Sequence, residues 1–352
     1  MLSWRLQTGL EILSINAAYL YSHDSPSLFY VINILLHLGL GLLVWLGLFR
    51  IAKQHFKTVS RMGQLALLAL AFSGTSGVAL VLIGNTQPNL WLLNGHIILS
   101  AVGVGAVISY LVIRRSRGWP VFALVAVLAL LIPAVVAEWD RSYPNPTSSI
   151  INPLVVPTSM EEEGAGASSP FFPSSANTNI DDTIPSNFFM KSESCAQAGC
   201  HPDIYKQWSS SAHHFSSFNN QWYRKSIEYM QDVVGTEPSK FCGGCHDHAV
   251  FFNGMMDQPI KEQLERPEAH VGLACTSCHS IVAVKSSMGN GDFVIEYPPL
   301  HDLATSENPF LRNLHDFIVR VDPGPHKSVF MKPFIRNQTV EYCSRCHKVH
   351  LD

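Results

Sequence analysis

Charged residues are scarce in this sequence: Asp, Glu, Lys and Arg make up 14% of its 352 residues, whereas an ordinary soluble domain has about 25%. The shortage is confined to residues 1–140, which contain 8 Lys or Arg and 4 Asp or Glu. Residues 141–352 hold the other 16 basic and 23 acidic residues. This split excludes a single soluble globular domain. The second part lacks a basic face, so we expect no nucleic-acid partner.

Long uncharged stretches fill the first part. They cover residues 25–49, 62–113 and 118–137, and the middle one is divided by the polar turn 85–89. A helix of about 20 apolar residues crosses a bilayer, and a polar turn separates two such helices. The sequence therefore predicts a four-helix transmembrane bundle over residues 28–140.

The connections between the predicted spans differ in charge. Two of them are basic, and loops rich in Lys and Arg stay in the cytoplasm. We therefore expect a multi-pass protein of the bacterial cytoplasmic (inner) membrane, with both ends of the bundle and everything after residue 140 on the outer, periplasmic side. The basic residues are Arg50, Lys53, Lys57 and Arg61 in the first of these connections, and Arg114, Arg115 and Arg117 in the second.

Residues 1–27 form a separate segment, which the charge rule also places outside. They lack the basic start and small-residue cleavage site of a secretory signal. Apolar residues alternate in this segment with Arg5 and Glu11. Two interpretations stay open: a helix lying on the outer leaflet, or a first helical turn packed on the bundle.

Two histidines lie inside predicted spans, His37 in the first and His96 in the third, both in the outer half of the membrane. Glycines adjoin them, which leaves room for a b-type haem between the helices. The more common arrangement is a histidine that hydrogen-bonds across helices, with small residues serving helix packing. A b-type haem is therefore the less favoured of the two expectations.

Residues 141–190 are rich in Pro and Ser and show no helical or strand period. This composition is typical of a semi-extended linker. A solvated linker is the favoured interpretation. The alternative is a segment that lies along a partner, because the paired phenylalanines at 171–172 and 188–189 are costly to expose to water.

All eight cysteines follow residue 190 and form four pairs, each with a histidine directly after the second cysteine. This is the attachment signature of c-type haem: two thiols form thioethers, and the histidine is the proximal iron ligand. Zinc sites and disulfides are the alternatives, but neither predicts a histidine after every pair. The predicted covalent and proximal residues are Cys195, Cys200 and His201, a motif widened by two residues; Cys242, Cys245 and His246; Cys275, Cys278 and His279; and Cys343, Cys346 and His347.

A second iron ligand from the protein makes an electron carrier, whereas an open iron position permits catalysis. Eight further histidines are available for four irons, so ligation by two histidines throughout is expected. The candidate distal ligands are His213, His301, His315 and His326, with His214, His248, His270 and His350 less favoured, and with Met255, Met256, Met288 and Met331 as other possible donors.

The first motif and its surroundings resemble a known family. The stretch 194–213 contains Cys-x-x-x-x-Cys-His and then Trp-x-x-Ser-x-His, which ends at His213. It resembles the tetrahaem cytochromes c that accept electrons from hydroxylamine oxidoreductase, and 272–279 resembles an internal haem motif of that family. The resemblance covers residues 191–352 only. It implies a mostly helical domain with long loops, His213 as a distal ligand to a neighbouring haem, and Tyr205 and Trp208 beside porphyrin faces.

The predicted architecture is mainly α: a four-span bundle, a linker, and a loop-rich, mostly helical tetrahaem domain over 191–352 with four covalent haems. We leave open that the sequence is a shortened form of a longer multihaem chain. Within the tetrahaem domain the patterns predict a hairpin over 281–297 and short helices at 203–214, 219–233, 258–266 and 308–320.

The predicted function is electron transfer between redox proteins, with the bilayer and a larger membrane complex as partners. The alternative is a multihaem reductase or oxidase of a small nitrogen or sulfur compound at a five-coordinate haem. Such an enzyme needs acid or base groups beside the iron, and the candidates are Asp247, His248, Arg320 and Lys327.

Overall fold

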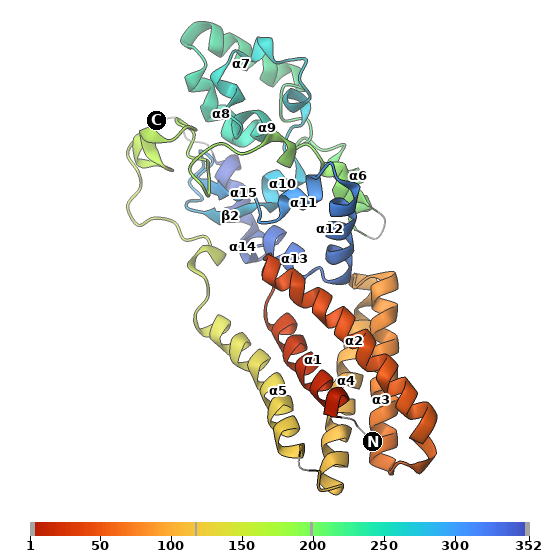
Figure 1. The fold of residues 1–352 in the computed structure, drawn as a ribbon. Helices are drawn as coiled ribbons and strands as arrows, with labels where there is room; N and C mark the ends of the chain where they lie inside the picture. Colours follow the sequence, from red (N-terminus) through yellow and green to blue (C-terminus); the bar gives the residue numbers. More distant parts are fainter. Residues whose placement is uncertain (1–3, 117, 198–199, 349–352) are drawn as a thin grey trace. The chain divides into compact units, whose positions relative to one another are not determined.

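The computed structural model describes residues 4–116, 118–197 and 200–348 (Figure 1). Helices make up 67% of the chain, which confirms the prediction of long apolar N-terminal helices followed by a loop-rich helical part. The chain divides into two compact units. Unit 1 comprises Met1–Pro144 and Ser306–Lys327, and unit 2 comprises Asn145–Thr305 and Ser328–Asp352.

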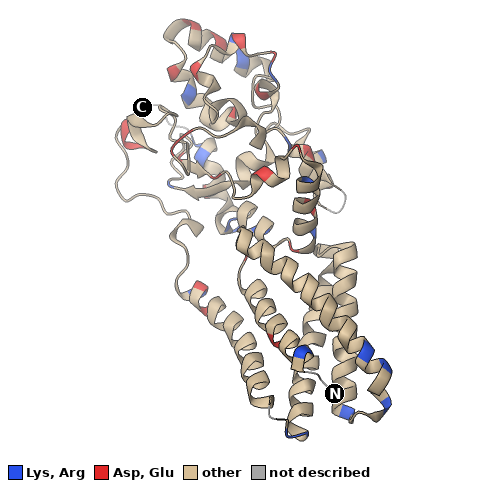
Figure 2. Ribbon diagram, viewed as in Figure 1, with Lys and Arg blue, Asp and Glu red and all other residues tan. Residues whose placement is uncertain are grey.

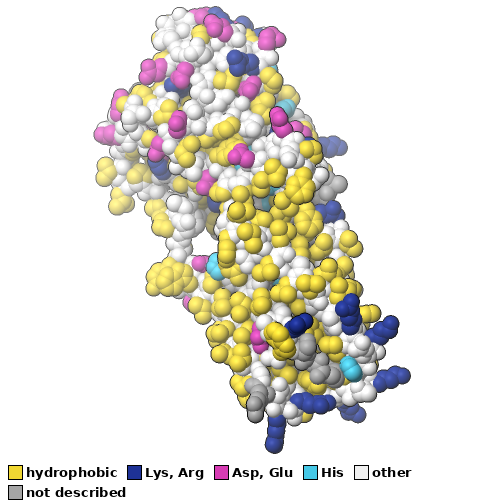
Figure 3. Space-filling model, viewed as in Figure 1, with side chains coloured by type: hydrophobic (Ala, Val, Ile, Leu, Met, Phe, Trp, Pro, Cys, Tyr) yellow, Lys and Arg dark blue, Asp and Glu magenta, His cyan; other side chains and the backbone are white. Residues whose placement is uncertain are grey.

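The four predicted spans are present in unit 1, and each is long and apolar enough to cross a membrane. Serine side chains fix where two of them begin, because Ser27 accepts from the Tyr30 amide and Ser60 from the Gly63 amide. Apolar side chains cover the surface of the bundle (Figure 3), as expected for helices surrounded by lipid. The helices are α2 (Leu28–His55), α3 (Arg61–Ile83), α4 (Leu90–Ile113) and α5 (Trp119–Ser142).

A fifth helix, α1 (Trp4–Ser22), runs alongside α2 in the opposite direction (Figure 1). At one end, Gln7 donates to the carbonyl oxygen of Gly118, in the connection between α4 and α5, at 3.3 Å. Further along, the Asn16 side chain donates to Asn33 of α2 at 2.9 Å. Because α1 follows the bundle from the α4–α5 connection toward the start of α2, it is neither a surface helix nor a single turn.

The N-terminal end of α1 lies at the end of unit 1 where the basic connections gather (Figure 2). Helix α1 is not among the four candidate membrane spans, so the side of the membrane on which residues 1–27 lie stays a prediction. The hydropathy of α1 is too low for a candidate membrane span, because the helix contains Arg5, Glu11 and the amide side chains of Gln7 and Asn16. Two of these polar side chains bond to each other, because Gln7 donates to Glu11 at 3.1 Å.

Helix α12 (Pro309–Val321) belongs to unit 1, although its sequence lies within the predicted tetrahaem domain. Ile318 packs with Tyr30 in an apolar cluster. The Arg320 guanidinium donates to the carbonyl oxygen of Leu82, at the end of α3, at 3.1 Å. The helix predicted at 308–320 is therefore confirmed, and its apolar face packs on the N-terminal helices.

Unit 2 consists of short helices, loops and a small sheet in the order β1-β3-β2. The predicted hairpin is confirmed, because β2 (Ile281–Val284) pairs antiparallel with β3 (Phe293–Ile295), and β1 (Asn177–Thr178) joins β3 in parallel. The helix predicted at 219–233 is present as α7. The helix predicted at 203–214 is present as α6, which ends at Trp208. Residues 258–266 were also predicted to be helical, but they form only a three-residue turn, Ile260–Glu262, between two prolines. The helices are α6 (Pro202–Trp208), α7 (Gln221–Val234), α8 (Lys240–His246), α9 (His248–Phe251), α10 (Cys275–His279), α11 (His301–Thr305), α14 (Pro333–Asn337) and α15 (Thr339–His347), with α13 (Gly324–Phe330) crossing from unit 1.

The second half of the predicted linker is part of the core of unit 2. Phe171, Phe188 and Phe189 are fully buried there, in one cluster with Phe252 and Phe293. The aromatic pairs therefore pack inside their own chain and not along a separate partner. Residues 151–156 remain exposed, as expected for a linker.

The buried side chain of Asp292, directly before β3, is expected to make the stability of unit 2 depend on pH. Its side chain is buried, with one carboxylate oxygen lacking a hydrogen-bond partner among the described residues, and burial raises its pKa to about 6. Because the pKa is higher in the folded state, ionisation costs stability as the pH rises from about 4 to about 6, and the cost persists above that range.

Asp292→Asn is expected to stabilise unit 2 by about 1 kcal/mol at pH 7 and to have no effect at pH 4, where the aspartate is protonated. The measurement is the thermal unfolding midpoint of the full chain in detergent at both pH values. The exposed carboxylate Glu265 provides the control variant, Glu265→Gln. An equal gain at pH 4 and pH 7 would show that the buried charge is not its source.

Candidate functional site

Three of the four cysteine motifs fold as a short helix: α8, α10 and α15. Residues three apart lie on one face of a helix, so both thiols of each motif share a face and the histidine follows directly. In the widened motif, the His201 amide donates to the carbonyl oxygen of Cys195 at 3.0 Å and closes the loop, of which 198–199 lie outside the described residues. All eight thiols are free.

The motifs meet in unit 2 although they are far apart in sequence. The thiol of Cys195 contacts that of Cys275, and the thiol of Cys245 contacts that of Cys346. The Arg345 guanidinium lies 3.7 Å from the sulfur of Cys278. The first motif is thereby joined to the third, and the second and third to the fourth.

A structural zinc ion takes four protein ligands. Over the described ranges 4–116, 118–197 and 200–348, no group of three His, Cys, Asp or Glu side chains is placed to hold a metal ion. A haem needs less from the protein, because the porphyrin itself supplies four nitrogen ligands.

The imidazole of His246 is held in one orientation. Its Nδ1 donates to the carbonyl oxygen of Ser216 at 2.9 Å. Its ring stacks on Tyr223, with centroids 4.5 Å apart, and the Tyr223 hydroxyl bonds to Asp247. Asp247 is fully buried and also accepts from Ser217, and burial raises its pKa to about 7. With Nδ1 engaged, Nε2 is the nitrogen available for a metal.

His279 shows the same arrangement, because its Nδ1 donates to the carbonyl oxygen of Phe330 at 2.8 Å. Metal-binding histidines commonly donate their second ring nitrogen to a carbonyl or carboxylate, which fixes the tautomer. Two of the four predicted proximal histidines therefore have the hydrogen bonding that an iron ligand requires.

His347, the proximal candidate of the fourth motif, faces His213, with ring centroids 6.0 Å apart. With metal–nitrogen bonds of about 2 Å, two imidazoles on opposite sides of one iron have centroids about 6 Å apart. Burial and the charges of His347 and Arg345 lower the pKa of His213, which favours the neutral, metal-binding imidazole. The structure thus brings together a proximal and a distal candidate.

The backbone around His213 is held by the third motif's segment. The Leu273 amide donates to the His213 carbonyl at 2.8 Å, and the Trp208 indole donates to the Leu273 carbonyl at 2.7 Å. Gly272 has a positive φ of 67°, and a Cβ there would lie 2.6 Å from the His213 carbonyl oxygen. Only glycine allows this approach.

Two of the less favoured candidates already use Nε2. His248 is buried among aromatic rings, and its Nε2 bonds to the Gly244 carbonyl at 2.9 Å. The Nε2 of His270 bonds to the carbonyl oxygen of Leu264. In His248 the other ring nitrogen, Nδ1, is buried and has no hydrogen-bond partner among the described residues.

The remaining candidates lie in different environments. His214 packs on Trp208 with ring centroids 4.5 Å apart, and His301 packs edge-on against Phe188 at 4.7 Å. His315 and His326 belong to unit 1, where His315 pairs with Asp316 at 3.0 Å. His350 lies outside the described residues. Of the candidate acid–base groups, Asp247 and His248 belong to unit 2, and Arg320 and Lys327 belong to unit 1.

Arg345 is a residue that sequence reasoning missed. It occupies a variable position inside the fourth motif, yet it is only 5% exposed. Its guanidinium lies 3.8 Å from the ring centroid of Tyr342 and 5.4 Å from that of Phe293. Burial raises the pKa of the Cys278 thiol, and the charge of Arg345 opposes that rise. The sequence signal for it was a permanent positive charge between the two cysteines of the motif.

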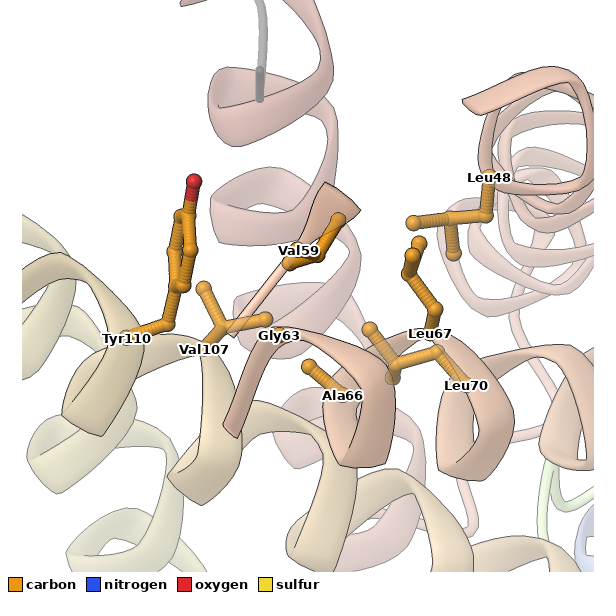
Figure 4. Close-up of a pocket in the computed structure, with 8 residues that line it drawn as sticks. All are labelled: Leu48, Val59, Gly63, Ala66, Leu67, Leu70, Val107 and Tyr110. Atoms are coloured by element: carbon orange, nitrogen blue, oxygen red, sulfur yellow. The ribbon is translucent and has the colours of Figure 1, made fainter. Parts of the chain in front are cut away.

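Unit 1 brings together His37 and His96, with ring centroids 6.3 Å apart. Two cavities also occur in this unit. One of about 540 Å³ is lined by residues of α1, α5 and the segment after α1, among them His23, Asp24 and Asp140. The other, of about 10 Å³, has room for no more than a water molecule. Figure 4 shows its apolar lining, which comprises Leu48, Val59, Gly63, Ala66, Leu67, Leu70, Val107 and Tyr110.

No family model, curated protein or solved structure matches the chain. Its function is therefore argued from its own residues: four apolar helices that fit a membrane, and a cluster of four cysteine–histidine motifs.

Proposed function

We propose that the chain is a membrane-anchored multihaem c-type cytochrome that transfers electrons between redox partners on the outer face of a bacterial cytoplasmic membrane. The observation that carries this proposal is the meeting of all four motifs in unit 2, with His347 facing His213 at 6.0 Å between ring centroids. Bound haems supply one-electron redox chemistry.

The residues then have separate tasks. The eight cysteines would hold four haems through thioether bonds, and His201, His246, His279 and His347 would be the proximal histidines. His213 would serve as a second histidine for the haem of the fourth motif. The carbonyl oxygens of Ser216 and Phe330 orient His246 and His279 and raise their basicity. Arg345 supplies a buried positive charge, which would balance the negative charge of a haem propionate.

Unit 1 is the membrane anchor, and charge sets its proposed orientation. Basic residues gather at one end of the helices (Figure 2), and such residues stay in the cytoplasm. The segment after α5 leaves the bundle at the other end, so the motifs it leads to are assigned to the periplasm, where c-type haem is attached. Partners are redox proteins, in a larger membrane complex.

The fifth helix makes this orientation testable. A green fluorescent protein fused before residue 1 is expected to fluoresce, because α1 begins at the basic, cytoplasmic end. An alkaline phosphatase fused after Tyr143 is expected to be active, because that enzyme needs the periplasm. The same phosphatase fused after Lys57 is the inactive control. An active phosphatase at the N-terminus would restore the four-span topology with both ends outside.

Spectroscopy separates the electron carrier from the enzyme. We expect electron paramagnetic resonance of the oxidised full chain to show low-spin signals only, with no change when nitrite or nitric oxide is added. A high-spin haem that binds either ligand would instead favour the reductase or oxidase. Eight reactive thiols without bound haem would reject both functions.

A further inference from the structure

The two histidines of unit 1 lie on the inward faces of their helices. On α2, His37 continues a stripe of buried residues, Ile34 before it and Val44 after it, at the three- and four-residue spacing of one helix face. On α4, His96 lies seven residues before the buried Gly103 on the same face. Helices α2 and α4 both pack on α3, so both imidazoles point into the bundle and not toward lipid.

Each imidazole is held through its Nδ1. The Nδ1 of His37 lies 3.0 Å from the side-chain oxygen of Asn16 on α1. The Nδ1 of His96 donates to the carbonyl oxygen of Ser73 on α3 at 2.9 Å. These bonds leave Nε2 of both rings for a ligand, as at metal-binding histidines. The ring centroids are 6.3 Å apart, close to the spacing of about 6 Å for two imidazoles on one iron.

The two glycines of α2 beside His37, Gly39 and Gly41, differ from the packing glycines elsewhere in the bundle. A Cβ on Gly74 would lie 2.1 Å from Trp45, so that glycine serves close helix packing. By contrast, Gly41 lies one turn from His37 on the same face, and within the described part of the chain no heavy atom comes within 4 Å of its Cβ position. Space is therefore open beside His37, along the face that carries it.

The number of protein ligands selects the cofactor. A bare zinc ion would need about four protein ligands, and only two histidines meet here, with no third His, Cys, Asp or Glu grouped with them among the described residues. An iron porphyrin brings four ligands of its own and needs only two axial imidazoles.

We propose that His37 and His96 are the axial ligands of one non-covalently bound haem inside unit 1. This inference does not rest on the function proposed for unit 2, because it uses none of the cysteine motifs. Its consequence is that the helices hold a redox group within the membrane, so they exchange electrons as well as anchor the chain.

The test is extraction of the purified full chain with acidified acetone, which removes haem held by axial ligands and leaves thioether-linked haem on the protein. We expect about one extractable haem per chain. His37→Ala and His96→Ala are each expected to reduce it at least tenfold, whereas His55→Ala, at the end of α2, leaves it unchanged. The gel-filtration profile of each purified variant in detergent reports whether the chain has folded.

A matched glycine pair tests the site without removing a ligand. Gly41→Leu fills the open space beside His37 and is expected to reduce the extractable haem at least tenfold. Gly39→Leu, two residues away on another face of the same helix, is expected to retain it. An absence of extractable haem, or its retention in His37→Ala, His96→Ala and Gly41→Leu, would overturn the inference. Because covalent haem is counted separately, that result would leave the proposal for unit 2 standing.

Discussion

Replacing Cys275 and Cys278 together by alanine is expected to leave three covalent haems in place of four and to lower the thermal unfolding midpoint of unit 2 by about 10 °C or more. The third motif lies at the centre of the unit. The Tyr342 hydroxyl donates to the carbonyl oxygen of Cys278 at 2.6 Å, and the Thr276 hydroxyl donates to that of Phe188 at 3.0 Å. A small domain built around bound groups loses their binding energy when one is lost.

Haem-stained gels and the melting curve of the purified full chain measure this effect. Ser344→Ala is the control, because it changes a variable position of the fourth motif, whose hydroxyl bonds only within α15, and removes no thiol. An unchanged haem content in the double variant would mean that these cysteines hold no haem.

Replacing His213 by alanine is expected to convert one low-spin haem to high-spin, because His213 faces His347 at 6.0 Å between ring centroids. Electron paramagnetic resonance of the oxidised chain would show a new high-spin signal equivalent to about one haem per chain. Added imidazole should restore the low-spin signal, because it can occupy the position that His213 vacates.

The neighbouring histidine provides a closely matched control. His214 packs on Trp208, so His214→Ala is expected to leave every haem low-spin. If His214→Ala produced the high-spin signal and His213→Ala did not, the ligand would be His214. If neither variant changed the spectrum, the pairing of His213 with His347 would not reflect iron ligation.

The sequence predicted the apolar spans well, because length and hydropathy alone specify a membrane helix. For residues 1–27 it left open an interfacial helix or a first turn packed on the bundle, whereas the structure has a 19-residue helix, α1, whose Asn16 bonds to Asn33 of α2. It did not place α12 with the N-terminal helices. The Tyr30 hydroxyl donates to Asp322 at 2.8 Å across 292 positions of sequence, and no local pattern reports such a pairing.

The candidate site, too, was predictable from the sequence only in its local features. The cysteine motifs are local, so their spacing alone predicts thiols on one helical face beside a histidine. A long-range contact singles out one of the eight remaining histidines, because His213 lies beside His347, 134 positions later in the sequence. Composition favoured a linker before residue 190, but burial of Phe171 and Phe189 makes that segment part of the core.

The most direct measurement is the intact mass of the purified full chain, produced in cells that attach c-type haem and combined with a titration of free thiols. The account predicts a mass higher than that of the 352-residue polypeptide by four haem groups, and no reactive cysteine. A mass equal to the bare polypeptide, with eight reactive thiols or with bound zinc, would contradict it.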